Sequence, residues 1–184
     1  NYFPKKKVIV TGNPLRYTSN NKSKTNAFKS IGLSPNKLTI LVIGGSLGSA
    51  RINQLIKYYL KDFMMLNVQL LWQCGKIYEQ KYKTLKNKNV HITPFIENMS
   101  SAYQISDIVI SASIEPEAFG RVSVEAQSMQ KMIVASNLGG SNETVIDGKT
   151  GILFEAGNSD ELSEKIIKVM NNKRINLSKF FHQS

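Results

Sequence analysis

The stretch that decides the fold begins with the apolar run Ile108-Val109-Ile110 and continues to Pro116-Glu117-Ala118-Phe119-Gly120-Arg121-Val122-Ser123-Val124-Glu125. Small polar residues, Ser111 and Ser113, follow the apolar run, and residues 122–129 have the character of a helix. The order is therefore strand, loop, helix, with the loop at the carboxyl end of a strand. Open α/β sheets bind their ligands at that edge.

Two glutamates in this stretch, Glu117 and Glu125, flank a glycine that opens the predicted helix. The free N–H groups of a first helical turn suit a diphosphate. A carboxylate is a poor phosphate ligand, but it accepts strong hydrogen bonds from hydroxyl groups. A ligand with a diphosphate in the middle and hydroxyl groups at both ends is a nucleotide-sugar, and the pattern favours that ligand.

Outward from this stretch, apolar runs alternate with helix-like segments. We expect an α/β fold, a single Rossmann-like doubly wound parallel sheet of about six strands in the order 3-2-1-4-5-6. The uninterrupted apolar run at residues 38–43 predicts strand 1, buried on both faces, and residues 108–111 predict strand 4. A short extra segment at residues 7–10 should pack at the margin. The predicted helices cover residues 24–31, 50–65, 99–105, 122–129 and 159–170, the last with a capping box formed by Asn158 and Glu161.

A glycine-rich loop, Gly44-Gly45-Ser46-Leu47-Gly48-Ser49, follows strand 1. Its spacing departs from the dinucleotide fingerprint, and no acidic residue ends the next strand at residues 68–72, so a dehydrogenase is excluded. The loop still places backbone amides, including that of Gly45, and the hydroxyl of Ser46 at a helix N-terminus. That arrangement suits a phosphate.

Composition limits the class of protein. A chain of 184 residues with 41% hydrophobic residues supports one domain over residues 1–184. The single cysteine, Cys74, excludes an internal disulfide and is expected in the core. The net charge of +11 comes from scattered lysines, which argues against nucleic acid and leaves peripheral contact with an anionic membrane open. With no initiator methionine and no secretory signal, we expect a cytoplasmic piece of a longer protein, in the cytosol or at the inner face of the membrane.

The two glutamates, separated by seven residues with Phe119-Gly120 between them, resemble the Glu-x7-Glu motif of family 4 retaining glycosyltransferases of the GT-B fold. Three downstream runs are similar to the same family: Ala126-Gln127-Ser128-Met129, Ser136-Asn137-Leu138-Gly139-Gly140-Ser141-Asn142-Glu143 and Asp147-Gly148-Lys149-Thr150-Gly151. The resemblance implies that Glu117 contacts the donor sugar and Glu125 the ribose hydroxyls. It also implies that the backbone of Gly120, Arg121 and Val122 contacts the diphosphate.

The front of the chain, about residues 6–111, resembles the MurG family (family 28), which transfers N-acetylglucosamine to a lipid-linked acceptor in peptidoglycan synthesis. The runs that carry the resemblance are Thr11-Gly12-Asn13-Pro14-Leu15-Arg16, Ile43 to Asn53, Trp72-Gln73-Cys74-Gly75-Lys76 and Pro94-Phe95-Ile96-Glu97-Asn98-Met99. This resemblance implies that Arg16 and Ser46 approach the donor phosphates or base, and that the backbone of Ile96 faces the uracil. It agrees with family 4 on Glu125.

The two resemblances predict a junction between two families near residues 111–115. Family 28 inverts the anomeric centre and family 4 retains it, so the stereochemistry stays open. Family 4 also expects Gly-Arg at the end of strand 1, where this chain has Gly45-Ser46; Arg51 is the candidate substitute. His91 and His182 have no metal or nucleophile partner in the sequence, and we predict no metal and no cofactor beyond a UDP-sugar donor.

A GT-B enzyme has two Rossmann-like domains, and this chain corresponds to the donor-binding half without the N-terminal acceptor domain. Three hypotheses follow. The chain binds a nucleotide-sugar, UDP-N-acetylglucosamine in particular, with little or no transfer alone. It is an enzyme subunit that gains an acceptor domain in trans. Or it is a recombined structural fusion that binds no ligand.

Overall fold

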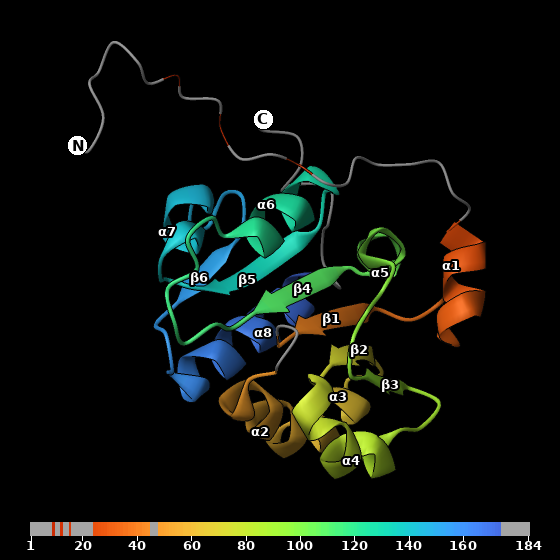
Figure 1. The fold of residues 1–184 in the computed structure, drawn as a ribbon. Helices are drawn as coiled ribbons and strands as arrows, with labels where there is room; N and C mark the ends of the chain where they lie inside the picture. The colour runs from red at the N-terminus through yellow and green to blue at the C-terminus, as the bar shows by residue number, and fades with distance from the viewer. Residues whose placement is uncertain (1–8, 10–11, 13–14, 16–23, 45–47, 174–184) are drawn as a thin grey trace.

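The computed structural model describes residues 9, 12, 15, 24–44 and 48–173. Six strands form one sheet in the order β3-β2-β1-β4-β5-β6 (Figure 1). All neighbouring pairs are parallel. The strands are β1 (Thr39–Ile43), β2 (Gln69–Gln73), β3 (Val90–Thr93), β4 (Ile108–Ser111), β5 (Met132–Ser136) and β6 (Ile152–Phe154). The predicted fold class, strand order and places of strands 1 and 4 are confirmed.

Helices cover both faces of the sheet (Figure 1). One face packs against α1 (Lys24–Ile31), α5 (Met99–Ile105), α6 (Arg121–Ser128) and the neighbouring α7 (Gly140–Thr144). The other packs against α2 (Ala50–Tyr58), α3 (Leu60–Met65), α4 (Glu79–Tyr82) and α8 (Ser159–Lys173). Short 3-10 turns, η2 (Lys76–Tyr78) and η3 (Lys83–Leu85), flank α4.

The central strand β1 shows why an uninterrupted apolar run is needed. Ile40 and Val42 belong to the core on the α2 and α8 face, whereas Leu41 and Ile43 belong to the core on the α5 and α6 face. All five residues of β1 are buried. Because helices cover both faces, neither set of side chains reaches solvent.

The helices differ from the sequence prediction in two respects. The helix predicted at residues 50–65 is two helices that meet at Tyr59, where the backbone leaves helical geometry at φ −86° and ψ 9°. Neither glycine nor proline marks this break, so the sequence carries no signal for it. The turns at residues 76–85 and helix α7 were not predicted, and the segment at residues 7–10 lies outside the described residues except for Ile9.

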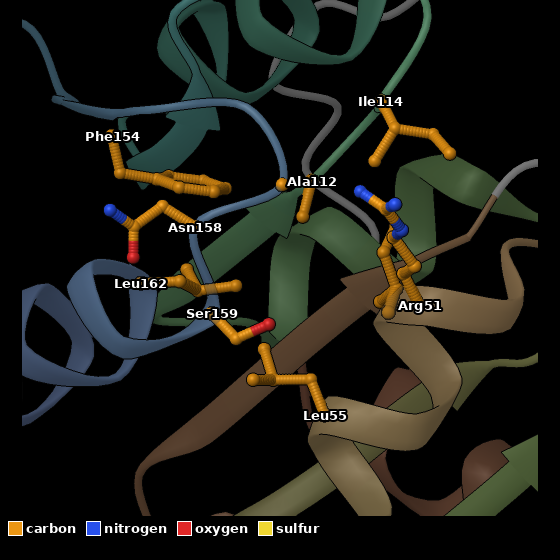
Figure 2. Close-up of a pocket in the computed structure, with 10 residues that line it drawn as sticks. Arg51, Leu55, Ala112, Ile114, Phe154, Asn158, Ser159 and Leu162 are labelled. Atoms are coloured by element: carbon orange, nitrogen blue, oxygen red, sulfur yellow. The ribbon is translucent and has the colours of Figure 1, made fainter.

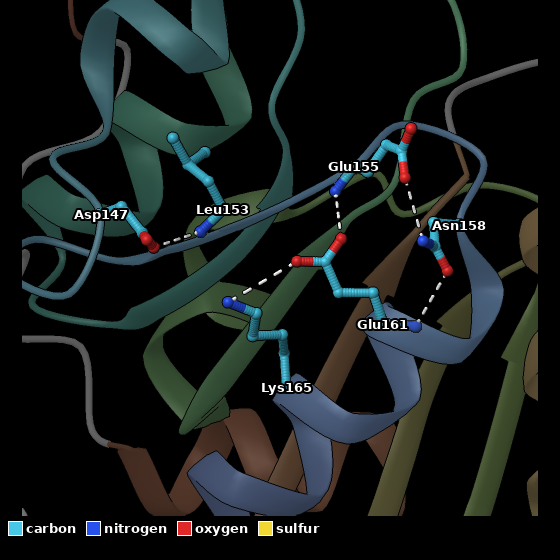
Figure 3. Close-up of polar contacts among 6 residues, drawn as sticks. All are labelled: Asp147, Leu153, Glu155, Asn158, Glu161 and Lys165. Carbon is cyan, nitrogen blue, oxygen red and sulfur yellow. Dashed lines mark hydrogen bonds and ion pairs between the residues drawn. The ribbon is translucent and has the colours of Figure 1, made fainter.

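The cap of α8 forms in a different way from the predicted box (Figure 3). Asn158 Oδ1 accepts a hydrogen bond from the Glu161 N–H at 3.0 Å, as expected. The Glu161 carboxylate, however, accepts from the backbone N–H of Glu155 at 2.7 Å, because the Asn158 N–H already donates to the Glu155 carbonyl. The carboxylate therefore ties the end of β6 to the helix, and Lys165 lies 3.7 Å from its other oxygen.

No helix in the described part of the chain combines the length and the apolar character that crossing a membrane requires.

Candidate functional site

Two loops at the carboxyl edge of the sheet pack backbone against backbone. One follows β4 and carries Glu117; the other follows β5 and contains Gly139 and Gly140. The Gly140 N–H donates to the Glu117 carbonyl at 2.7 Å. A Cβ on Gly139 would lie 2.7 Å from that same carbonyl oxygen, so only glycine permits the approach.

Gly120 makes the second close contact between these loops. Its backbone is left-handed, at φ 53° and ψ 39°, and it precedes α6 without any side-chain cap. A Cβ there would lie 2.5 Å from the Gly140 carbonyl carbon. The first N–H groups of α6, those of Arg121 and Val122, have no intrahelical acceptor, so the helix begins with donors suited to an anion.

Glu117 is half-buried on the loop before α6. Burial raises the pKa of its carboxyl group, and the positive charge of nearby Arg121 opposes that shift. A carboxylate that is short of water gains more from a ligand hydroxyl than a fully hydrated one does.

Glu125 lies on α6 and is only 7% exposed. Its Oε2 accepts a hydrogen bond of 2.9 Å from the hydroxyl of Tyr103, on α5. Sequence reasoning missed this partner, because 22 residues separate the two side chains and no local pattern links them.

Buried polar contacts join α6 to α7. The hydroxyl oxygens of Ser123 and Ser141 lie 3.1 Å apart, and both residues are buried. The Gln127 amide donates to the carbonyls of Ser123 and Thr144, each at 3.1 Å. These contacts fix the helix that carries Glu125 against α7, which begins at Gly140.

Arg51 lies in a pocket on the α2 and α8 side of the same sheet edge (Figure 2). Its side chain extends toward Ile114, on the loop that follows β4, and a Cβ on Gly157 would lie 2.9 Å from its guanidinium. Among the described residues the one ion pair is Lys165–Glu161, so Arg51 forms none there. Its charge is available beside the loop that carries Glu117.

The other predicted phosphate ligands, Arg16, Gly45 and Ser46, lie outside the described residues. The structure describes the residues on either side of Gly45 and Ser46 in the glycine-rich loop. The Gly44 N–H donates to the Gln73 carbonyl at 3.2 Å, and Ser49 caps α2. A Cβ on Gly48 would lie 2.2 Å from the Cys74 carbonyl oxygen, so the backbone of Gly48 lies close to the end of β2.

Ile96 is buried beside a second pocket, between α1, α5 and the end of β3, whose lining includes His91, Thr93, Phe95 and Asn98. The Ile96 N–H donates to the side-chain oxygen of Gln73 at 3.0 Å. That amide is therefore occupied within the protein. Burial lowers the pKa of His91, which helps keep its imidazole neutral.

The described residues contain no group of three or more His, Cys, Asp or Glu side chains that could hold a metal ion. Cys74 is fully buried, as expected from the sequence, and burial raises the pKa of its thiol.

The arrangement described so far is a doubly wound parallel α/β domain, with a helix N-terminus and carboxylates at the carboxyl edge of the sheet, where such folds bind their ligands. The family model described as "Glycosyl transferases group 1" matches residues 3–182. The chain therefore belongs to the group 1 glycosyl transferases.

Relatives of the MurG type are similar over part of the chain. The "UDP-N-acetylglucosamine--N-acetylmuramyl-(pentapeptide) pyrophosphoryl-undecaprenol N-acetylglucosamine transferase" of Flavobacterium psychrophilum is 47% identical over 115 residues, which are 61% of this chain and 31% of that protein. The protein of the same name from Christiangramia forsetii is 42% identical over 59% of this chain and 30% of its own length. The chain thus spans about a third of the relatives that it matches.

Solved structures of GT-B glycosyltransferases share the fold. A glycosyltransferase from Rickettsia africae superimposes with a TM-score of 0.70 at 27% identity, over 82% of this chain and 43% of that one. Anabaena Alr3699/HepE, solved with UDP and glucose, gives a TM-score of 0.70 at 24% identity, over 89% and 45%. The C-terminal domain of the group 1 protein LpcC from Francisella tularensis gives 0.63 at 20% identity, over 84% and 85%.

Proposed function

We propose that this chain binds a UDP-sugar as the donor-binding part of a GT-B glycosyltransferase. The observation that carries the proposal is the assembly at the start of α6. Open N–H groups follow Gly120, a half-buried carboxylate at Glu117 precedes them, and a buried carboxylate at Glu125 lies one turn further on. These groups match the diphosphate, sugar and ribose of a single ligand.

In this proposal the backbone of Gly120, Arg121 and Val122 binds the diphosphate, with Arg51 supplying positive charge from the neighbouring pocket. Glu117 accepts hydrogen bonds from the sugar, and Glu125 from the ribose hydroxyls. Gly45, Ser46 and Arg16 complete the phosphate contacts by resemblance, and the carbonyl of Ile96 contacts the base. The names of the MurG-type relatives favour N-acetylglucosamine as the sugar and UDP as the carrier.

We expect binding with little or no transfer by the chain alone. Orienting an acceptor and removing its proton supply much of the rate of any glycosyl transfer. The residues assembled here face the donor, and Glu117 is the single carboxylate assigned to the sugar. An acceptor domain, in the same or another chain, would supply the rest, and peripheral membrane contact belongs to that same proposal.

The test is a two-by-two titration by calorimetry. Glu117→Ala and Glu125→Ala are each titrated with UDP and with UDP-N-acetylglucosamine, and Glu164→Ala, an exposed glutamate of α8, is the matched control. Glu125→Ala should weaken both ligands equally, about 10- to 100-fold, the range for a lost charged hydrogen-bonding group. Glu117→Ala should weaken the UDP-sugar more than UDP, because UDP lacks the sugar.

Unchanged UDP affinity in Glu125→Ala would refute the ribose assignment. If the wild-type chain binds neither ligand at millimolar concentration, the pocket is vestigial and the structural-fusion hypothesis is favoured instead.

A further inference from the structure

The environment of Glu125 is unusual for a carboxylate. The side chain is 7% exposed and lies on α6 beside Ala126 and Met129, both members of the apolar core. Within the described residues it forms no ion pair, and its carboxylate accepts one hydrogen bond, from Tyr103. A buried carboxylate needs hydrogen-bond donors to offset the loss of water, so this contact is central to its stability.

Tyr103 is itself held rigidly. It is fully buried on α5, as are Ala102 and Ile105 of the same helix. The start of α5 is fixed by Asn98, whose side-chain oxygen accepts from the Ser101 N–H at 3.0 Å. The phenol ring therefore has little freedom to move, and its hydroxyl donates to Glu125 Oε2 from a fixed position.

We infer that Tyr103 is a positioning residue for the ribose-binding carboxylate, an inference that rests on the proposed function. A carboxylate offers about four acceptor positions on its two oxygens. The tyrosine hydroxyl occupies one of them and fixes the rotation of the carboxylate before the ligand arrives. The remaining positions are then held ready for the 2′- and 3′-hydroxyls of the nucleotide.

The gain from this arrangement is preorganisation. A free glutamate side chain loses rotamer freedom when it binds, and that loss reduces affinity. A carboxylate already held by Tyr103 has lost this freedom in the folded protein. The effect of Tyr103 on binding should therefore depend on the ribose hydroxyls, although the phenol itself need not touch the ligand.

The chain offers a matched control in Tyr82. It is 1% exposed, close to the 0% of Tyr103, but lies on α4, in the core on the opposite face of the sheet. Its hydroxyl has no hydrogen-bond partner among the described residues. Removing the Tyr82 hydroxyl thus makes the same chemical change in a buried ring without touching Glu125.

The experiment compares UDP with 2′,3′-dideoxy-UDP, which lacks both ribose hydroxyls, by calorimetric titration of wild type, Tyr103→Phe and Tyr82→Phe. Thermal melting confirms that each variant is folded. Tyr103→Phe should bind UDP about three- to tenfold more weakly, the effect of one net hydrogen bond, and dideoxy-UDP within twofold of wild type. Tyr82→Phe should bind both ligands as wild type does.

A double-mutant cycle tests the same Tyr103–Glu125 hydrogen bond by changing Glu125. Glu125→Gln should lose most of the preference for UDP over dideoxy-UDP, and adding Tyr103→Phe to it should change little further. Equal weakening of both ligands in Tyr103→Phe, or no weakening at all, would overturn the positioning role. If wild type binds UDP and dideoxy-UDP equally, this inference fails while nucleotide binding stands. If wild type binds neither, the proposed function fails with it.

Discussion

At the scale of single residues, two glycines at the site collide with each other if either gains a side chain. A Cβ on Gly120 would lie 2.5 Å from the carbonyl carbon of Gly140, and a Cβ on Gly140 would lie 2.3 Å from the amide nitrogen of Gly120. Gly120 also has a left-handed backbone, at φ 53°. Gly148 shares the positive φ, at 74°, but has open space around its Cβ position.

Alanine substitutions at these three glycines distinguish the cost of a left-handed backbone from the cost of steric overlap between the loops. Gly148→Ala should lower the free energy of unfolding by about 1–2 kcal/mol, the cost of a left-handed alanine. Gly140→Ala should cost about 2–3 kcal/mol through overpacking of rigid backbone, and Gly120→Ala more than either, because it has both problems. Urea unfolding followed by the fluorescence of Trp72, the one tryptophan, measures all three. If Gly120→Ala and Gly148→Ala lower the free energy of unfolding equally, the loops that follow β4 and β5 move apart easily.

The raised pKa of Glu117 predicts how donor binding changes with pH. Burial moves its titration above the ordinary carboxyl value of 4.5, so protonation begins at a higher pH than for an exposed glutamate. In that pH range the folded protein binds more protons than the unfolded chain, so the stability contributed by this group falls as pH rises. The fold is therefore stabilised by the protonated form of Glu117, whereas accepting a hydrogen bond from a sugar hydroxyl through the carboxylate requires the ionised form.

The ratio of the wild-type affinity to the Glu117→Gln affinity for UDP-N-acetylglucosamine should therefore fall as pH is lowered through the range just above 4.5. Glu117→Gln is the reference because its side chain does not titrate, and the UDP-sugar is the ligand because, unlike UDP with a terminal phosphate of pKa about 6, it has no phosphate group that titrates in this range. Calorimetric titrations between pH 4.5 and pH 7.5 measure it. A ratio that falls with rising pH would mean that the protonated carboxyl group binds the sugar.

At the scale of elements, Asn53 joins helix α2 to strand β2. It is fully buried; its side-chain oxygen accepts from the Trp72 indole N–H, and its amide donates to the Cys74 carbonyl, both at 2.8 Å. Asn53→Ala would leave both partners buried without a hydrogen bond. The free energy of unfolding should fall by about 2–4 kcal/mol.

Gln54→Ala, the next residue and an exposed position of the same helix, is the control and should change stability by less than about 0.5 kcal/mol. Because Trp72 loses its partner, its fluorescence in the folded Asn53→Ala variant should also change. Similar unfolding energies for the two variants would mean that water replaces the lost hydrogen bonds.

The strands were predictable because each is a local signal. An apolar run such as residues 38–43 has one arrangement that buries all its side chains, a central parallel strand, and the strand order follows from the alternation with helices. The break at Tyr59 was not predictable, since the residues around it favour a helix. It lies just before α3, whose Phe63 is buried in the core on that face of the sheet, a tertiary contact that no local pattern indicates.

The position of the candidate site in the fold was also predictable, because it rests on a local strand, loop and helix pattern. Motif spacing placed Glu117, Gly120 and Glu125 around the start of one helix, and the structure has that helix. The hydrogen bonds that hold the site could not be predicted, since Tyr103 and Glu125, Gln73 and Ile96, and Ser123 and Ser141 are brought together only by the packing of different elements. Local patterns indicate the residues that we propose to face the ligand, and only the fold identifies the contacts that support them.

At the scale of the whole molecule, the predicted junction near residues 111–115 lies just after the centre of one continuous core. Strand β4, before the junction, pairs along its length with β5, after it, from Ile108–Met132 to Ser111–Ala135. Val42 and Trp72 from the front of the chain share a cluster with Val134, Phe154 and Ile166 from the back. Neither part can bury its apolar side chains without the other.

We therefore expect one cooperative unfolding transition, whatever the origin of the two parts. Trp72 reports on the front of the chain, and a dye attached at Glu164→Cys, on the exposed side of α8, reports on the back. The native thiol should not compete for the dye, because Cys74 is fully buried and burial raises its pKa, which leaves little reactive thiolate. The two urea transitions should coincide in midpoint and slope. Two separate midpoints would mean that each part folds on its own, and the packing of β4 against β5 would then be a contact between two units rather than the interior of one.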